Sequence, residues 1–163
     1  MLRRRTLHAA LGLLALSSLL AACATTPAPA PIPDAAAAQA QLSTFTALVQ
    51  QAGLADTLRG AGPFTVFAPS DEAFKALPAA TLASLRANPA QLKDVLSLHV
   101  VAAQLPAEAI KNGPAKSLQG ANLALAKAGD FVTVEDAMVQ QANLAASNGV
   151  VHVIDRVLLP AKK

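Results

Sequence analysis

The chain contains neither tryptophan nor tyrosine, and its only aromatic residues are five phenylalanines. This absence argues against a sugar-stacking platform and against the aromatic surfaces on which nucleic-acid bases stack. Charge is also scarce, since 14% of the residues are charged. Without Arg3, Arg4 and Arg5, ten of the thirteen basic side chains remain, against ten acidic ones. With no basic stripe left outside the N-terminus, we predict no nucleic-acid partner.

Cys23 is the only cysteine, so no disulfide can form within the chain. The folded part must therefore depend on its hydrophobic core, for which about 120 residues suffice. Metal ligands are few, because His8, His99 and His152 are the only histidines and no ligand cluster surrounds them. The chain also has no glycine-rich phosphate loop and no G-x-S-x-G segment. We predict no metal and no cofactor.

The N-terminus has the pattern of an export signal. Arg3, Arg4 and Arg5 are followed by an apolar stretch, Leu7–Leu20, that is too short for a spanning helix. We interpret residues 1–22 as a signal peptide and leave Sec and twin-arginine export as alternatives.

The segment Leu20-Ala21-Ala22-Cys23 resembles a bacterial lipobox, in which the cysteine sulfur receives diacylglycerol. The alternative is an ordinary signal peptide with a chance cysteine. Ala24 stands where an inner-membrane retention signal would carry Asp. The resemblance therefore implies a lipid-anchored protein of the bacterial cell envelope, in the outer membrane and facing the periplasm or the cell surface.

Composition divides the remaining chain into a tether and one domain. Residues 23–40 comprise the lipidated cysteine and a segment rich in Ala and Pro, which is typical of a semi-extended linker. Residues 41–160 carry the apolar patterns of a single folded domain. We see no internal repeat and no second domain.

The domain has an α+β pattern, in which helices come first and most strands follow. Apolar spacing predicts helices near 41–52, 54–58, 71–77, 81–87 and 92–99, a helical turn at 106–111, and strands near 64–68, 100–101, 123–127, 131–134, 137–140 and 150–157. Ser70 is placed to cap a helix, and Asn148-Gly149 to form a tight turn with positive φ. We predict that Phe64, Phe67, Phe74 and Phe131 lie in the core.

Two segments resemble the signatures of the fasciclin-type (FAS1) extracellular domain. They read GPFTVFAPSDEAF at residues 62–74 and NGVVHVIDRVLLP at residues 148–160. The resemblance covers essentially the whole folded part. It implies a wedge-shaped β-sandwich with helices along one edge, and a role in adhesion or interaction rather than catalysis.

In vertebrate fasciclin domains, adhesion to integrins is attributed to an Asp-Ile pair before the final turn and to a Tyr-His pair after the long helix. The matching positions here are Asn143-Leu144 and Leu98-His99. The acidic residue and the tyrosine are missing, which weakens the case for integrin-type adhesion. We keep Asn143, Leu144, Leu98 and His99 as candidate partner-binding residues, by resemblance alone.

Each residue that could carry chemistry also has a structural interpretation. His99 could be a pH-sensitive contact or could bond the last carbonyls of its helix, and His152 could be a base or a hydrogen-bonded strand residue. Asp71 and Asp155 could form an acid–base pair, or serve as a helix-end residue and a loop anchor. Ser70 is weaker still as a nucleophile. We favour the structural interpretation throughout and predict that the chain is not an enzyme.

The sequence therefore predicts a membrane-anchored fasciclin-like adhesion or interaction module, outside the cytoplasm, that binds a protein or polysaccharide of the envelope or matrix. The alternative is a periplasmic small-ligand-binding or accessory protein. An exposed apolar patch rimmed by polar residues would favour the first, and a closed pocket with convergent polar groups the second.

Overall fold

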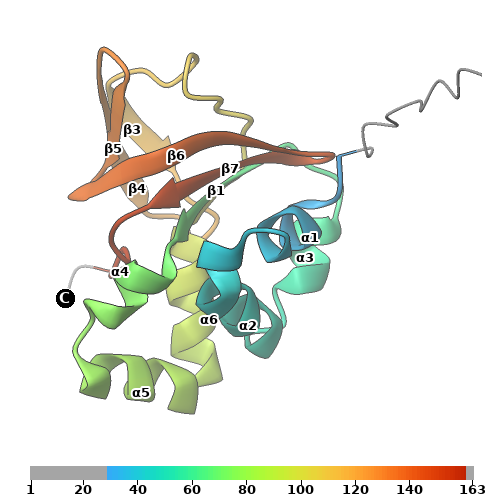
Figure 1. Ribbon diagram of the computed structural model, residues 1–163, viewed down its shortest axis with the longest axis vertical. Helices are drawn as coiled ribbons and strands as arrows, with labels where there is room; N and C mark the ends of the chain where they lie inside the picture. The colour runs from blue at the N-terminus through green and yellow to red at the C-terminus, as the bar shows by residue number, and fades with distance from the viewer. Residues whose placement is uncertain (1–28, 161–163) are drawn as a thin grey trace, which may run out of the picture.

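A computed structural model describes residues 29–160 (Figure 1). The helices of this part are α1 (Ile32–Ala37), the 3₁₀ helix η1 (Ala40–Leu42), α2 (Ser43–Gln51), α3 (Ala55–Arg59), α4 (Asp71–Lys75), α5 (Ala79–Ala87) and α6 (Pro89–Leu98). The strands are β1 (Phe64–Pro69), β2 (Val100–Val101), β3 (Gly113–Lys116), β4 (Asn122–Ala128), β5 (Phe131–Val134), β6 (Ala137–Ala146) and β7 (Gly149–Ile154).

The strands follow the order β2-β1-β7-β6-β5-β4-β3. The pair β1–β7 is parallel, with Phe64 opposite Gly149 and Pro69 opposite Ile154, and the other pairs are antiparallel. A bridge between Val101 and Ser117 brings the two ends of this order near each other. In Figure 1 the helices gather on one side of β6 and β7, and β3–β5 lie on the other side. The predicted α+β architecture is confirmed.

Strands β1 and β7 are buried on both faces and separate two hydrophobic clusters. On the helical side, Val66 and Val151 pack with side chains of α1, α2 and α6. On the other side, Phe67 and Ile154 pack with β4 and β5. Parallel strands covered on both faces read as continuous apolar runs, which explains the patterns at 64–69 and 149–154. The two halves of the strand order thus pack face to face as a sandwich.

The predicted tether, residues 23–40, includes residues that belong to the folded domain. Ile32–Ala37 is a helix, and Ile32 and Ala36 are 0% and 1% exposed in the core. The guanidinium of Arg59 in α3 binds the Asp34 carboxylate of α1, with Nη2–Oδ1 at 2.9 Å and Nε–Oδ2 at 3.4 Å. Pro at the first helical turn and one well-placed apolar residue allow a short helix that tertiary contacts then stabilise.

Ser147 and Asn148 connect β6 to Gly149, the first residue of β7, but neither Asn148 nor Gly149 has the predicted positive φ. The glycine is needed for another reason, because a Cβ at this position would collide with the Phe64 carbonyl of the adjacent strand. The Asn148 side chain accepts a hydrogen bond from Ile32 N (3.0 Å) and donates to Leu58 O (2.6 Å) and Gly60 O (2.9 Å). This dipeptide therefore joins α1 and the end of α3 to the central strands.

One predicted core phenylalanine is on the surface. Phe67 and Phe74 are buried and Phe64 is half-buried, but Phe131 is 69% exposed. In β5 the buried positions are Val132 and Val134. Because side chains alternate across a strand, Phe131 must point to the opposite, outer face.

Ser70 caps α4 as predicted, since its hydroxyl accepts a hydrogen bond from Ala73 N at 3.3 Å. We expect Ser70→Ala to lower the free energy of unfolding by about 1 kcal/mol, because one backbone N–H loses its partner. Urea unfolding measures the change. Ser84→Ala, at an exposed position of α5, is the matched control and should leave the midpoint unchanged or slightly raised. Equal effects of the two changes would contradict a capping role.

Candidate functional site

Strand β6 carries an irregularity at the predicted site residue Asn143. The pairing with β7 shifts between Val139 and Gln141 and again between Gln141 and Leu144. Asn143 lies in the second interruption with φ +59°, a conformation that Asn tolerates better than most residues. Its side chain is exposed, while that of Leu144 is half-buried and packs against the helical core cluster. We call residues 141–144 the β6 bulge.

The Asn143 side chain holds the turn that follows Pro106. Its Oδ1 accepts a hydrogen bond from Ala107 N at 2.8 Å, and its Nδ2 donates to Glu108 Oε1 at 2.8 Å. Both partners belong to residues 102–112, which have no helix or strand. The bulge and the 106–109 turn therefore form one surface, and Asn143 gives it a defined shape.

His152 supports this surface from beneath. The Asn143 N–H donates to its Nδ1 at 3.3 Å, so the ring proton lies on Nε2, which donates to Leu105 O at 2.8 Å. The ring stacks on Phe67 with a centroid distance of 5.5 Å. Burial lowers the pKa of His152, although the Leu105 carbonyl and the Glu108 carboxylate oppose the shift. A neutral, doubly bonded ring fits the strand-residue interpretation of His152 better than a catalytic base.

Other strands fasten the same loop. Thr65 of β1 donates its hydroxyl to Ala103 O at 2.6 Å and accepts from Leu105 N at 2.8 Å. The Lys127 ammonium donates to the carbonyls of Ala107 (2.7 Å) and Glu108 (3.3 Å). Each of these bonds uses a side chain from another element, so the loop takes its shape from tertiary contacts rather than from its own sequence.

Leu98 and His99 do not lie on a surface, being 4% and 0% exposed. The ring Nδ1 of His99 donates to Val95 O at 2.8 Å, and its Nε2 accepts from Leu158 N at 3.0 Å. This corrects the prediction that these two residues contact a partner, because the C-terminal segment and β4–β5 cover the end of α6. Burial lowers the pKa of His99 to about 4, although its bond to the Val95 carbonyl favours the protonated ring.

The carboxylates considered for acid–base chemistry are used by backbone groups. Asp71 accepts hydrogen bonds from Thr44 N (2.8 Å) and Ser43 Oγ (2.7 Å) at the start of α2. Partial burial would raise the pKa of Asp71, but these bonds outweigh it and the pKa is lowered. Asp155 accepts from Met138 N at 2.7 Å and so anchors the start of β6. The helix-end and loop-anchor interpretations are therefore supported.

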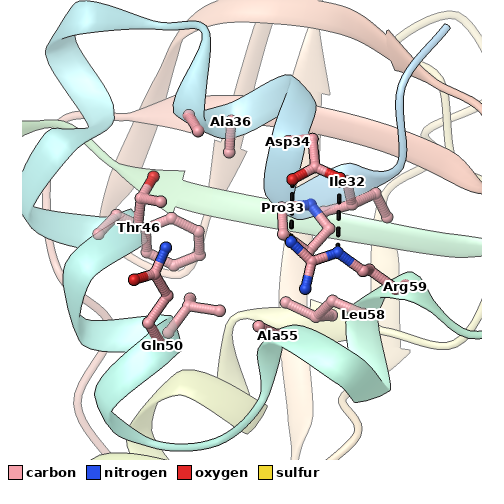
Figure 2. A pocket seen from close by; sticks show the side chains of 12 residues that line it. Ile32, Pro33, Asp34, Ala36, Thr46, Gln50, Ala55, Leu58 and Arg59 are labelled. Atoms are coloured by element: carbon pink, nitrogen blue, oxygen red, sulfur yellow. Dashed lines mark hydrogen bonds and ion pairs between the residues drawn. The ribbon is translucent and has the colours of Figure 1, made fainter.

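A small cavity lies between α1, α2 and α3 (Figure 2). The Asp34–Arg59 ion pair lies on one side of it, and Thr46 and Gln50 on the other. Its free volume is about 30 Å³, which has room for one or two water molecules. The remaining lining is mostly apolar and comes from the helical core cluster. This cavity is too small for a metabolite.

Residues 29–160 bring no three His, Cys, Asp or Glu side chains together in a group that could hold a metal ion. Within the same residues, no helix has the length and apolar character needed to cross a membrane. The predicted lipidation residue, Cys23, lies outside the described residues, as does the signal peptide.

Sequence reasoning found Asn143 but missed its partners. Glu108 and Ala107 have no distinctive local signal beyond the predicted helical turn after Pro106. Their role depends on the approach of β6, which is separated from them by about 35 residues of chain. The predicted strand near 137–140 ended before Asn143, whereas β6 continues to Ala146. Asparagine is disfavoured in strands, and here it marks an interruption of the strand rather than its end.

Comparisons with known proteins agree with this architecture. The fasciclin domain family model matches residues 40–160. Protein sll1483 of Synechocystis is 44% identical over 120 residues, which are 72% of this chain and 67% of that protein. Cell surface glycolipoprotein MPB83 of Mycobacterium bovis is 38% identical over 124 residues, 73% of this chain but only 56% of that protein.

Among solved structures, the chain is similar to a FAS1 domain pair from the insect cell adhesion molecule Fasciclin I. The TM-score is 0.61 with 22% sequence identity, over 75% of this chain and 46% of that chain. This likeness concerns the fold, and it confirms the wedge-shaped fasciclin-like architecture expected from the two signature segments.

Proposed function

The chain belongs to the fasciclin domain family, and on this basis we propose that it is a lipid-anchored interaction module outside the cytoplasm. Its partner is a protein or polysaccharide of the envelope or matrix, and the module has no chemistry of its own. The relatives include a cell surface glycolipoprotein, and the structural neighbour comes from a cell adhesion molecule. These descriptions support the proposal at the level of location and of binding.

The β6 bulge is the observation that carries the proposal. It presents exposed Gln141, Ala142 and Asn143 beside exposed Glu108. The Asn143 side chain is already fixed by two hydrogen bonds, and its backbone N–H by a third, to His152. A surface that is ordered before binding loses little conformational entropy when a partner arrives. Its mixture of an acid, two amides and a small apolar residue suits a polar partner surface.

We expect Ala142→Arg to reduce capture of a partner from envelope and matrix fractions by at least about tenfold, because a long charged side chain would stand in the contact. Immobilised chain from Ala24 to Lys163 serves as bait, and captured material is quantified by mass spectrometry and glycan analysis. Ala142 is exposed, so the substitution should leave the unfolding midpoint unchanged.

Ala87→Arg is the matched control, since Ala87 is an exposed alanine at the end of α5, away from the bulge. It should capture the partner like the wild type. A second variant, Asn143→Gly, tolerates the positive φ but removes both side-chain bonds, and it should also weaken capture. Equal capture by Ala142→Arg, Asn143→Gly and wild type would contradict a role of this surface.

The anchoring part of the proposal depends on Cys23. The seven residues Ala24–Ala30 precede the folded part, and at about 3.5 Å each they reach at most about 25 Å. Ala30 is joined to the domain by the hydrogen bond from Ser147 N, at 2.9 Å. An anchor at Cys23 would therefore hold the β6–β7 turn close to the lipid surface.

We expect Cys23→Ser to release the chain from membranes, because each buried lipid CH₂ contributes about 0.8 kcal/mol and the variant has no acyl chain. Fractionation measures the release, and mass spectrometry of the mature N-terminus identifies the modification. An unmodified wild-type N-terminus, or one beginning elsewhere, would contradict lipidation.

A further inference from the structure

The sheet formed by β4, β5 and the start of β6 has an unusual outer face. Its inner face carries Leu123, Leu125, Val132 and Val134, which are buried. Its outer face, which we define by the residues alternating with these, is exposed or half-buried. The carboxylate of exposed Glu135 lies at its edge, where Oε1 accepts a hydrogen bond from Ala124 N at 2.7 Å. The outer face consists of Ala124, Ala126, Ala128, Phe131, Thr133 and Met138.

Strand register places these side chains in rows. Ala128 is opposite Phe131, Ala126 is opposite Thr133, and Thr133 is opposite Met138. Residues paired across strands point to the same face of a sheet. Phe131 is 69% and Met138 44% exposed, so two large apolar side chains stand beside a flat area of alanine methyl groups. Large side chains next to a flat apolar area are typical of an interaction surface.

The shape of the outer face allows two copies of it to pack against each other about a two-fold axis. Phe131 lies at its end near the β4–β5 turn, and Ala124 lies at the other end, on the far side of the Ala126–Thr133 row. A two-fold axis that lies in the interface plane, crosses that row and is perpendicular to the line from Phe131 to Ala124 would set Phe131 of one copy on Ala124 of the other. A two-fold interface uses the same patch on both copies, so a projecting ring and a flat site must occur on one face, as they do here.

Two exposed residues of opposite charge lie at the two ends of the outer face. Asp130 precedes Phe131 in the β4–β5 turn, and Lys116 lies beyond Ala124, opposite Asn122 on the edge strand β3. Both side chains are exposed. Within residues 29–160 neither takes part in an ion pair. The reversal that seats Phe131 on Ala124 also brings Asp130 of each copy toward Lys116 of the other, which gives two opposite-charge contacts at the rim.

We propose that the outer face is the interface of a two-fold symmetric homodimer of this chain, with Phe131 as its central contact and Lys116–Asp130 pairs at its rim. The dimer does not depend on the proposed partner, because the outer face and the β6 bulge are different surfaces. A lipid anchor would favour it further, since confinement to a membrane raises the effective concentration of the copies.

Sedimentation equilibrium of the chain from Ala24 to Lys163 tests the proposal at concentrations from about 1 μM to 1 mM. We expect a monomer–dimer equilibrium with Kd on the order of 100 μM or tighter. Phe131→Ser should weaken it at least about tenfold, as loss of a central aromatic contact does. Ala87→Arg, at an exposed position of α5 outside this face, is the control and should not change Kd.

A charge exchange identifies the orientation of the two copies. Lys116→Glu and Asp130→Lys should each weaken the dimer about three- to tenfold, and the double variant should return to within about twofold of wild type. A chain that stays monomeric throughout would overturn the proposal. So would a dimer indifferent to Phe131→Ser, a double variant no better than the single ones, or a monomer that binds phosphatidylglycerol vesicles through Phe131.

Discussion

Phe67→Ala is expected to lower the free energy of unfolding by about 3–5 kcal/mol, the usual cost of removing a buried phenylalanine. Phe67 is fully buried and lies between the two halves of the sandwich, where it contacts the cluster that includes Leu125 and Ile154. It also stacks on His152, the ring that supports the β6 bulge. The loss is a large part of the stability of a single domain, typically about 5–15 kcal/mol.

Phe131→Ala is the matched control for this measurement. The same substitution at a ring that is 69% exposed should change stability by no more than about 0.5 kcal/mol in dilute solution. Urea unfolding, followed by far-UV circular dichroism, compares the two. A midpoint that hardly moves for Phe67→Ala would show that the sandwich halves do not pack through this ring.

Acid should destabilise the fold between about pH 6.5 and pH 4 through His99. Burial lowers the pKa of His99 in the folded chain to about 4 from its usual 6.5. In this pH range the His99 ring is protonated in the unfolded chain but largely neutral in the folded chain, so the free energy of unfolding falls as the pH falls. The loss attributable to His99 is about 3 kcal/mol at pH 4. The pKa of His152 is also lowered, which adds in the same direction.

His99→Gln provides the control, because an amide can still donate to Val95 O and accept from Leu158 N but does not titrate. The variant should be less stable at pH 7 and should lose much less stability between pH 7 and pH 4.5. Asp71, whose pKa is lowered, contributes stability that is lost only as the pH falls through and below the usual 3.8. The same pH dependence in wild type and His99→Gln would contradict a buried neutral His99.

Local sequence determined most of the elements, but α1 and β3 were not predicted, and β6 continues to Ala146 where the predicted strand ended near residue 140. Alternating or continuous apolar runs identified β1, β4, β5 and β7, and the helical spacing identified α2 and α6. Ser70 could be placed as a cap because capping depends on residues three positions apart. The two signature segments also predicted the family and the α+β fold.

Burial at individual positions was decided only by the tertiary structure. Phe131 is as apolar as Phe67, yet one is exposed and the other buried, because exposure depends on which face of the sheet another layer covers. Leu98 ends α6 and His99 follows it, and the C-terminal segment packs over both. Ile32 looked like part of a linker and is instead a core residue.

The β6 bulge also depends partly on local sequence and partly on tertiary contacts. From sequence alone, Asn143 is one polar residue near a turn, and its partners Ala107 and Glu108 are unremarkable loop residues. Their hydrogen bonds join segments about 35 residues apart, and His152 below them is positioned by the parallel pairing of β1 with β7. The Ser70 cap and most of the helices and strands arise from neighbours in the chain, and the sequence by itself therefore determined them. Surfaces arise from segments brought together by burial of the core, and only the folded chain could decide which side chains share one.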